Sequence, residues 1–202
     1  MTRSRRSGVL GGRPAATTRG RLSSVAIDLF TANGFDETSV DDIAAAAGIA
    51  RRTLFRYYPS KNSLPWGEFE EHLAELRNLL HSSPSEAPLG VSLRDALIAF
   101  NTVPASERDE HRRRMSLLLG VPALQAHSMI VYADWRAVIA EHCAERLGLD
   151  AASHIPQTIA WQALGTALAA YDQWLLDADA DLTELLRVGG DILINGVSSL
   201  TA

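Results

Sequence analysis

The chain has 202 residues, 47% of them apolar, and a formal net charge of −5, which suits one large or two small domains with a buried core. It contains no apolar run long enough to span a bilayer and no apolar stretch behind its basic N-terminus, so neither a membrane span nor a secretory signal is predicted. A single cysteine excludes an internal disulfide. These features predict a cytoplasmic protein without membrane partners.

Charge is divided unevenly along the chain. Residues 1–61 hold ten cationic and five acidic side chains, whereas residues 62–202 hold nine arginines and nineteen acids. A basic segment on an acidic body is typical of a nucleic-acid-binding module. Residues 1–16 carry four arginines among Gly, Ser, Thr and Pro, a composition that predicts a disordered arm. Either the arm contacts phosphates or a minor groove, or its charge is incidental.

The first predicted helix runs from about Thr18 to Asn33 and ends at Gly34. The stretch Thr38 to Lys61 then predicts two short helices joined by a turn at Gly48. In the first of these, Ser39 and Asp42 have the spacing of a capping box.

The second short helix, from about Ala50 to Tyr57, breaks two local rules. Arg51 and Arg52 lie in its first turn, where the helix dipole disfavours cations, and Ala50 has no capping hydroxyl. Phosphate oxygens and base acceptors would relieve both penalties, and the arginine fork matches O6 and N7 of guanine. We interpret this segment as a DNA-recognition helix; a solvated cationic helix end is the alternative, which the charge distribution disfavours.

Six more helices are predicted after this unit. Ser60 is expected to cap one that continues to about His81, with Pro65 tolerated in its first turn or at a kink. Residues 82–92 read as a linker rich in Ser and Pro. The remaining helices are expected near residues 92–102, 106–119, 122–147, 152–177 and 181–198.

The last two predicted helices are apolar on more than one face, so each needs two packing partners. Gly189 and Gly190 inside the final helix cost about 1 kcal/mol each relative to alanine, a cost that close helix approach offsets. We therefore predict a homodimer through these two helices, which would place two recognition helices on successive major grooves of a palindromic operator. The alternative is a monomer with a buried final helix.

One set of residues between Val25 and Leu64 matches a known pattern. It comprises Ala26, Phe30, Gly34, Phe35, Thr38, Ser39, Val40, Ile43, Ala44, Ala47, Gly48, Ile49, Thr53, Leu54, Phe55, Tyr58, Ser60 and Lys61. This set resembles the DNA-binding domain of the TetR family of bacterial regulators. Within that family, ARRTLFRYYPSKNSLPWGEF resembles the regulators that accompany mycofactocin biosynthesis genes in actinobacteria. The chain departs from the family in two places, because Ala50 stands where Ser is usual and Phe55 where a phosphate-contacting Tyr is usual.

The resemblance implies an all-α fold of about nine helices. Residues 17–60 would form a three-helix helix-turn-helix DNA-binding domain, and residues 61–202 a helical effector-binding and dimerisation domain. Bases would be read by Arg51, Arg52 and Thr53, and phosphates would be contacted by Thr18, Arg19, Ser39, Arg56, Tyr57 and Lys61.

The resemblance also implies a small-molecule effector whose binding changes the spacing of the recognition helices. The predicted lining residues are Phe69, Leu73, Phe100, Arg112, Met115, Leu118, Tyr132, Trp135, Trp161 and Trp174. Each apolar one, taken alone, is also typical of a plain core. Arg112, Arg113 and Arg114 would meet an anionic head group, or would form a solvated stripe. An apolar tail with an anionic head, such as a long-chain acyl-CoA, fits this set best.

No enzyme, cofactor or metal site is predicted. His142 and Cys143 are adjacent and point about 100° apart on a helix, so they cannot act as a base and nucleophile pair. The histidines lack the spacing and cysteine partners of a metal site. The sequence thus predicts a repressor released by an amphipathic ligand and controlling mycofactocin genes. Alternatives are a repressor of efflux or lipid-metabolism genes, and a helical acyl-CoA-binding protein or enzyme.

Overall fold

The computed structural model describes residues 18–197, and every regular element in that range is a helix. The elements are α1 (Arg19–Asn33), α2 (Val40–Ala46), α3 (Arg51–Tyr57), the 3-10 helix η1 (Lys61–Trp66), α4 (Phe69–His81), α5 (Leu89–Phe100), the 3-10 helix η2 (Ala105–Glu107), α6 (Arg108–Gly120), α7 (Pro122–Leu147), α8 (His154–Leu176) and α9 (Leu182–Val197). The predicted all-α class with about nine helices is confirmed. None of these helices is by itself long and apolar enough to cross a membrane. The predicted arm at residues 1–16 lies outside the described residues.

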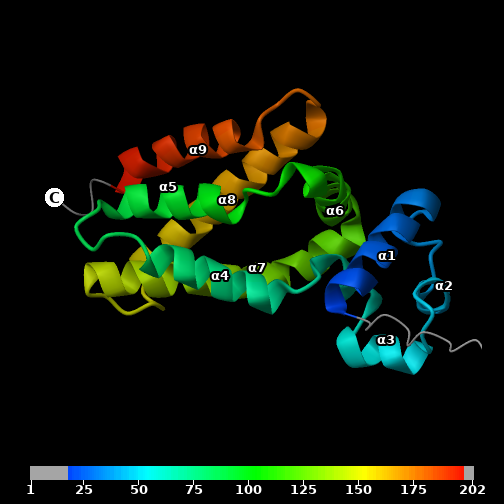
Figure 1. Cartoon of the computed structure of the whole chain (residues 1–202). Coiled ribbons are helices and arrows are strands. Elements are labelled where there is room, and N and C mark those ends of the chain that lie inside the picture. Colours follow the sequence, from blue (N-terminus) through cyan, green and yellow to red (C-terminus); the bar gives the residue numbers. More distant parts are fainter. Residues whose placement is uncertain (1–17, 198–202) are drawn as a thin grey trace, which may run out of the picture.

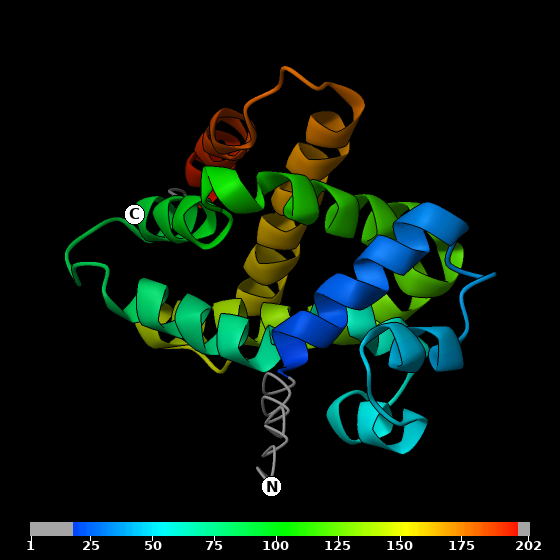
Figure 2. The ribbon, with the colours of Figure 1, turned by 45° about the vertical axis from the view of Figure 1, so that its right-hand side comes forward.

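Two hydrophobic cores divide the molecule, with α1 to α3 at one end and the other helices forming a long body (Figure 1). The smaller core lies around Phe30, Ile43 and Leu54, and Leu124 of α7 completes it. The larger core joins α4 to α9, and α8 crosses this body between α7 and α9 (Figure 2). Because Leu124 of the body completes the N-terminal core, a shift of α7 would change the packing of the first three helices.

The predicted helix ends of the N-terminal unit are confirmed. Thr18 caps α1, and Ser39 and Asp42 exchange both hydrogen bonds of a capping box at the start of α2. Gly34 and Gly48 follow these helices with φ of 92° and 69°, left-handed values that glycine adopts without strain. These ends depend on neighbouring residues only, which explains why the sequence reveals them.

The single helix predicted from Ser60 to His81 is wrong, because it is two helices. Ser60 caps the 3-10 helix η1, which contains Pro65, and the chain then turns at Gly67 before α4 begins. Gly67 has φ of 60°, and a Cβ atom there would lie 2.8 Å from Nη1 of Arg114 on α6. The positive φ therefore favours glycine at the break, and a Cβ atom there would also displace the end of the Arg114 side chain.

The predicted linker at residues 82–92 is too long, because α5 begins at Leu89 after Pro88. Leu89 and Gly90 are buried, so packing against the body extends this helix into a stretch whose composition reads as a loop. The starts of α6 to α9 lie within two residues of their predicted positions.

Close packing of α9 explains Gly189 and Gly190. A Cβ atom at Gly189 would lie 2.7 Å from Cγ2 of Thr166 on α8, and one at Gly190 would collide with Arg94 on α5. On α5, a Cβ atom at Gly90 would lie 2.9 Å from the Cα atom of Ile194. The predicted close approach is confirmed, and it is made to α5 and α8 of the same chain.

The contact of Gly90 with the backbone of α9 yields a stability prediction. Gly90→Ala should lower the free energy of unfolding by about 1–3 kcal/mol, because neither backbone can move without disturbing the core. Gly120→Ala is the matched control, since a Cβ atom there meets open space, and it should be neutral or stabilise by up to about 1 kcal/mol. Urea denaturation followed by circular dichroism at one protein concentration measures both; equal effects would contradict this packing.

Candidate nucleic-acid interface and effector cavity

The surface of α3 carries the candidate DNA-reading residues. Leu54 is buried and fixes the helix to the smaller core, whereas Arg51, Arg52 and Arg56 are exposed and Thr53 is half-buried. No side chain caps the first turn of α3, as predicted, so its free N–H groups and arginines share one surface. In both views this helix lies at the outer edge of the molecule, away from the body (Figures 1 and 2).

Arg51 is already paired within the chain. Its Nη1 atom lies 2.9 Å from Oδ2 of Asp41, and its guanidinium carbon lies 5.5 Å from the ring centre of Phe55. Both side chains of the ion pair are largely exposed, so the pair contributes at most about 1 kcal/mol. An acceptor such as guanine can therefore displace Asp41 at little cost.

The predicted phosphate-contacting residues make local contacts. Arg19 and Arg56 are exposed, with their guanidinium groups 5.9 Å and 5.3 Å from the ring centres of Tyr58 and Tyr57. Lys61 is different, because it is half-buried and its Nζ atom donates to the Phe35 carbonyl oxygen at 2.6 Å.

The hydroxyls of Thr18 and Ser39 serve as helix caps, and the hydrogen bonds from Ser39 hold the pKa of Asp42 below its ordinary value. All of these DNA contacts remain predictions.

A cavity of about 670 Å³ lies within the body and reaches the N-terminal unit. Its walls come from α4, the end of α5, α6, α7 and α8, and its end nearest to α1 is formed by Gly20, Ser24, Pro65 and Trp66. Six predicted residues line it, namely Phe69, Phe100, Met115, Leu118, Tyr132 and Trp135.

Four predicted lining residues lie elsewhere, and these predictions are corrected. Leu73 and Trp174 are buried in the larger core, and Arg112 packs over the Trp174 ring at 4.8 Å instead of facing the cavity. Trp161 is 47% exposed on the outer side of α8, with the guanidinium of Arg136 at 3.6 Å from its ring centre. Helical periodicity shows that a face is apolar, but it cannot show whether that face meets a cavity, a core or the outside.

The cavity contains a polar chain that the sequence did not reveal. The amide nitrogen of Asn101 donates to the Leu97 carbonyl, which leaves its Oδ1 atom to accept from the Tyr171 hydroxyl at 2.8 Å. The Tyr171 hydroxyl also lies 2.8 Å from Nε2 of His111, so His111 must donate this second hydrogen bond. Burial, helped by Arg114 and then His72, lowers the pKa of His111 to about 4, which keeps the ring neutral at pH 7.

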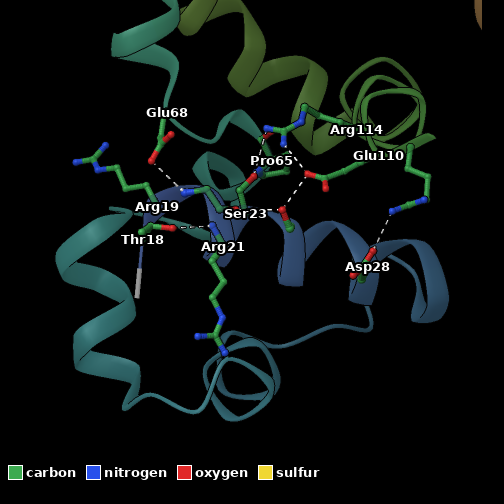
Figure 3. Close-up of polar contacts among 12 residues, drawn as sticks. Thr18, Arg19, Arg21, Ser23, Asp28, Pro65, Glu68, Glu110 and Arg114 are labelled. Carbon is green, nitrogen blue, oxygen red and sulfur yellow. Dashed lines mark hydrogen bonds and ion pairs between the residues drawn. The ribbon is translucent and has the colours of Figure 1, made fainter. Parts of the chain in front are cut away.

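Polar side chains join α6 to α1 (Figure 3), and most of them also belong to the cavity wall. Arg114 donates to Oε1 of Glu110 at 3.0 Å, to the Pro65 carbonyl at 3.0 Å and to the Ser23 hydroxyl at 3.3 Å. The Ser24 hydroxyl donates to the same Glu110 oxygen at 2.9 Å. We call these five residues the α1–α6 junction. Four of them, all but Ser23, also line the cavity, so a molecule bound there would touch the groups that hold α1.

Family models match most of the chain. A model described as bacterial regulatory proteins of the tetR family matches residues 22–64, and one described as the MftR C-terminal domain matches residues 87–198. A protein of Mycobacterium tuberculosis, proposed to be the mycofactocin biosynthesis transcriptional regulator MftR, is 52% identical over 189 residues, which cover 94% of this chain and 96% of that protein.

Solved structures share the fold. The regulator FadR of Bacillus subtilis, in complex with stearoyl-CoA, has 15% identity and a TM-score of 0.63, with 88% of this chain and 98% of that chain covered. The repressor FadR of Thermus thermophilus, in complex with lauroyl-CoA, has 21% identity and a TM-score of 0.56, with 88% and 94% covered.

The α1–α6 junction yields a second prediction. Arg114→Met should lower the free energy of unfolding by about 1.5–3 kcal/mol, because it removes three charge-assisted hydrogen bonds and leaves Glu110 partly unpaired. Arg113→Met is the control on the same helix, since its ion pair with Asp28 at 3.2 Å is exposed and contributes at most about 1 kcal/mol. Backbone amides of α1 and η1 should exchange hydrogen faster in Arg114→Met than in the wild type, and not in Arg113→Met. Unchanged exchange in Arg114→Met would contradict the role of Arg114 in holding α1 and η1.

The neutral state of His111 predicts a pH dependence. Its pKa is lowered in the folded chain, so between pH 6.5 and about 4 the unfolded chain binds a proton that the folded chain does not. This group therefore makes stability fall with decreasing pH, by up to about 1.4 kcal/mol per pH unit. His111→Gln should flatten the stability profile in that window, as measured by urea denaturation. An unchanged slope would mean that His111 titrates normally.

Proposed function

The chain belongs to the TetR family of bacterial transcriptional regulators, and from this premise we propose a repressor whose homodimer releases a palindromic operator when a long-chain acyl-CoA fills the cavity. The observation that carries the proposal is the double role of Glu110 and Arg114, which line the cavity and also hold α1. We take residues 17–60 as the DNA-binding domain and residues 61–202 as the domain that binds the effector and the second subunit.

In this proposal α3 enters the major groove. Arg51, Arg52 and Thr53 in its first turn read base edges, while Arg19 and Arg56 approach phosphates. The exposed surface of α3 supports these roles, and the exposed pair of Arg51 with Asp41 can be replaced by DNA at little cost.

Two variants separate base reading from phosphate contact. Arg52→Ala should cost about 1–3 kcal/mol on the preferred operator and relax the preference at one position in each half-site. Arg19→Ala should weaken all sequences alike and lower the salt slope by about 1 per subunit. Fluorescence anisotropy on operator and random duplexes over a salt series measures both effects. Uniform weakening by both variants would overturn the assignment.

The second subunit would pack on the outer faces of α8 and α9. On α8, Trp161, Gly165 and Ala169 form an exposed stripe at i, i+4 spacing, and its small residues permit close helix approach. On α9, Val188 and Ile192 are exposed one turn apart. Gly189 and Gly190 of α9 are occupied by contacts within the chain, so these outer faces carry the dimer proposal.

Ile192 tests the dimer. Ile192→Glu should raise the dimer dissociation constant by at least about a hundredfold, because the interface would bury an unpaired charge, and operator binding should weaken with it. Ile130→Glu on α7 is the matched control, since Ile130 is 67% exposed and Ile192 is 71% exposed in the single chain. Light scattering after gel filtration measures the mass. A dimer that survives Ile192→Glu would place the interface elsewhere.

The acyl-CoA proposal is supported by the cavity. Its volume falls within the range of small-molecule sites, and its aromatic and aliphatic lining suits an acyl chain. One cation lies at the end near α1, namely Arg114, the one Lys or Arg side chain among the described lining residues. The two FadR proteins in complex with acyl-CoA have this fold, which adds support.

The ligand is tested by adding palmitoyl-CoA, or free CoA as control, to the complex with its operator. Release by the thioester alone would support the proposal. Release by neither compound would discard the acyl-CoA while leaving the regulator intact.

We propose that the regulated genes are those of mycofactocin biosynthesis, on the strength of the similarity to the M. tuberculosis protein. Selection of bound fragments from the organism's genomic DNA tests this. Recovery of sites next to efflux or lipid-metabolism genes instead would reassign the regulon.

We assign no catalytic activity to the chain. Burial raises the pKa of the Cys143 thiol to about 12, which leaves it a poor nucleophile.

A further inference from the structure

Phe55 is an apolar side chain in an otherwise cationic surface. It is 40% exposed, the only large apolar residue exposed to this degree between residues 18 and 66, whereas the adjacent Leu54 is buried. Nothing in the smaller core requires an aromatic ring at this position, since Phe55 is not among the residues that form or pack against that core. The exposed position of Phe55 on α3 therefore indicates a contact with another molecule.

The ring lies among the residues proposed to read bases. Phe55 follows Arg51 by four residues and Arg52 by three, spacings that bring side chains together on one helix face. The Arg51 guanidinium carbon is 5.5 Å from the ring centre. Neighbouring bases on one strand are about 3.4 Å apart, so this separation corresponds to one or two base-pair steps.

The chemistry of the ring limits what it can recognise. Phenylalanine has no hydroxyl and cannot donate a hydrogen bond to a phosphate. The apolar group that base edges present in the major groove is the 5-methyl group of thymine. Resting on the DNA-binding function proposed above, we propose that Phe55 contacts the methyl group of a thymine located one or two base pairs from the guanine read by Arg51. Phe55 is thus a specificity-determining residue.

Uracil substitution tests this contact directly, because uracil lacks only the methyl group and keeps all base pairing. An operator is first selected from random duplexes with the wild-type protein. Each thymine is then replaced in turn. One thymine position should be sensitive, and its replacement in a single half-site should weaken wild-type binding about fourfold, because one methyl group is removed from a contact that excludes water. Replacement of this thymine in both half-sites should weaken binding about sixteenfold.

Two variants identify the residue responsible. Phe55→Ala should weaken binding to the thymine operator and abolish the difference between thymine and uracil. Thr53→Ser is the control, since it removes a second methyl group that α3 offers beside Phe55, and it should preserve the difference. Circular dichroism checks that Phe55→Ala, a change at an exposed site, leaves the fold intact.

The outcomes are distinct. Specific wild-type binding that is insensitive to uracil at every position would overturn the role of Phe55 and leave the regulator standing; the ring would then contact sugar or phosphate. A thymine preference that persists in Phe55→Ala and is lost in Thr53→Ser would reassign the contact to Thr53. Wild-type protein that prefers no sequence would contradict the proposed function and this inference together.

Discussion

The contact between the N-terminal unit and the body depends on hydrogen-bond acceptors for one partly buried guanidinium, that of Arg114. A cation at this depth requires acceptors, and it finds them on three elements at once: Glu110 on α6, the Pro65 carbonyl in η1 and the Ser23 hydroxyl on α1. The turn at Gly67 lies beside the same group, since a Cβ atom there would lie 2.8 Å from Nη1. The guanidinium therefore links α6 to α1 and η1 at the place where the N-terminal unit meets the body.

That constraint connects the cavity with α3. The Glu110 carboxylate and the Arg114 guanidinium face the cavity on one side and hold α1 on the other, so an occupant that competes for either group would weaken the hold on α1. The smaller core then carries the change onward, because α1, α2 and α3 pack there as one unit with Leu124 of α7. An effector can shift the equilibrium between an arrangement with α1 held by α6 and one with α1 released only by the difference in its affinity for the two. We expect that difference to arise at the α1–α6 junction.

Sequence patterns predicted most of the helices and the N-terminal caps, since these depend on residues a few positions apart. They failed where distant residues decide. The turn at Gly67 lies against Arg114, 47 positions away, and α5 starts early where Gly90 packs against Ile194 of α9. Among the aromatic residues, Trp135 lines the cavity while Trp161 lies outside, although both belong to helices with apolar faces. Of the three adjacent arginines, Arg114 alone lines the cavity, a distinction set by helix rotation within the fold.

The most direct measurement of the coupling between cavity and α3 is the ratio of operator dissociation constants with and without saturating palmitoyl-CoA, compared between wild type and Arg114→Met. If the junction transmits the effect, palmitoyl-CoA should weaken wild-type binding by at least about fivefold, the lower end of typical coupling between sites, and the ratio should approach one in the variant. An equally large ratio in both proteins would contradict a route through Arg114, and a ratio of one in the wild type would contradict control of DNA binding by this ligand.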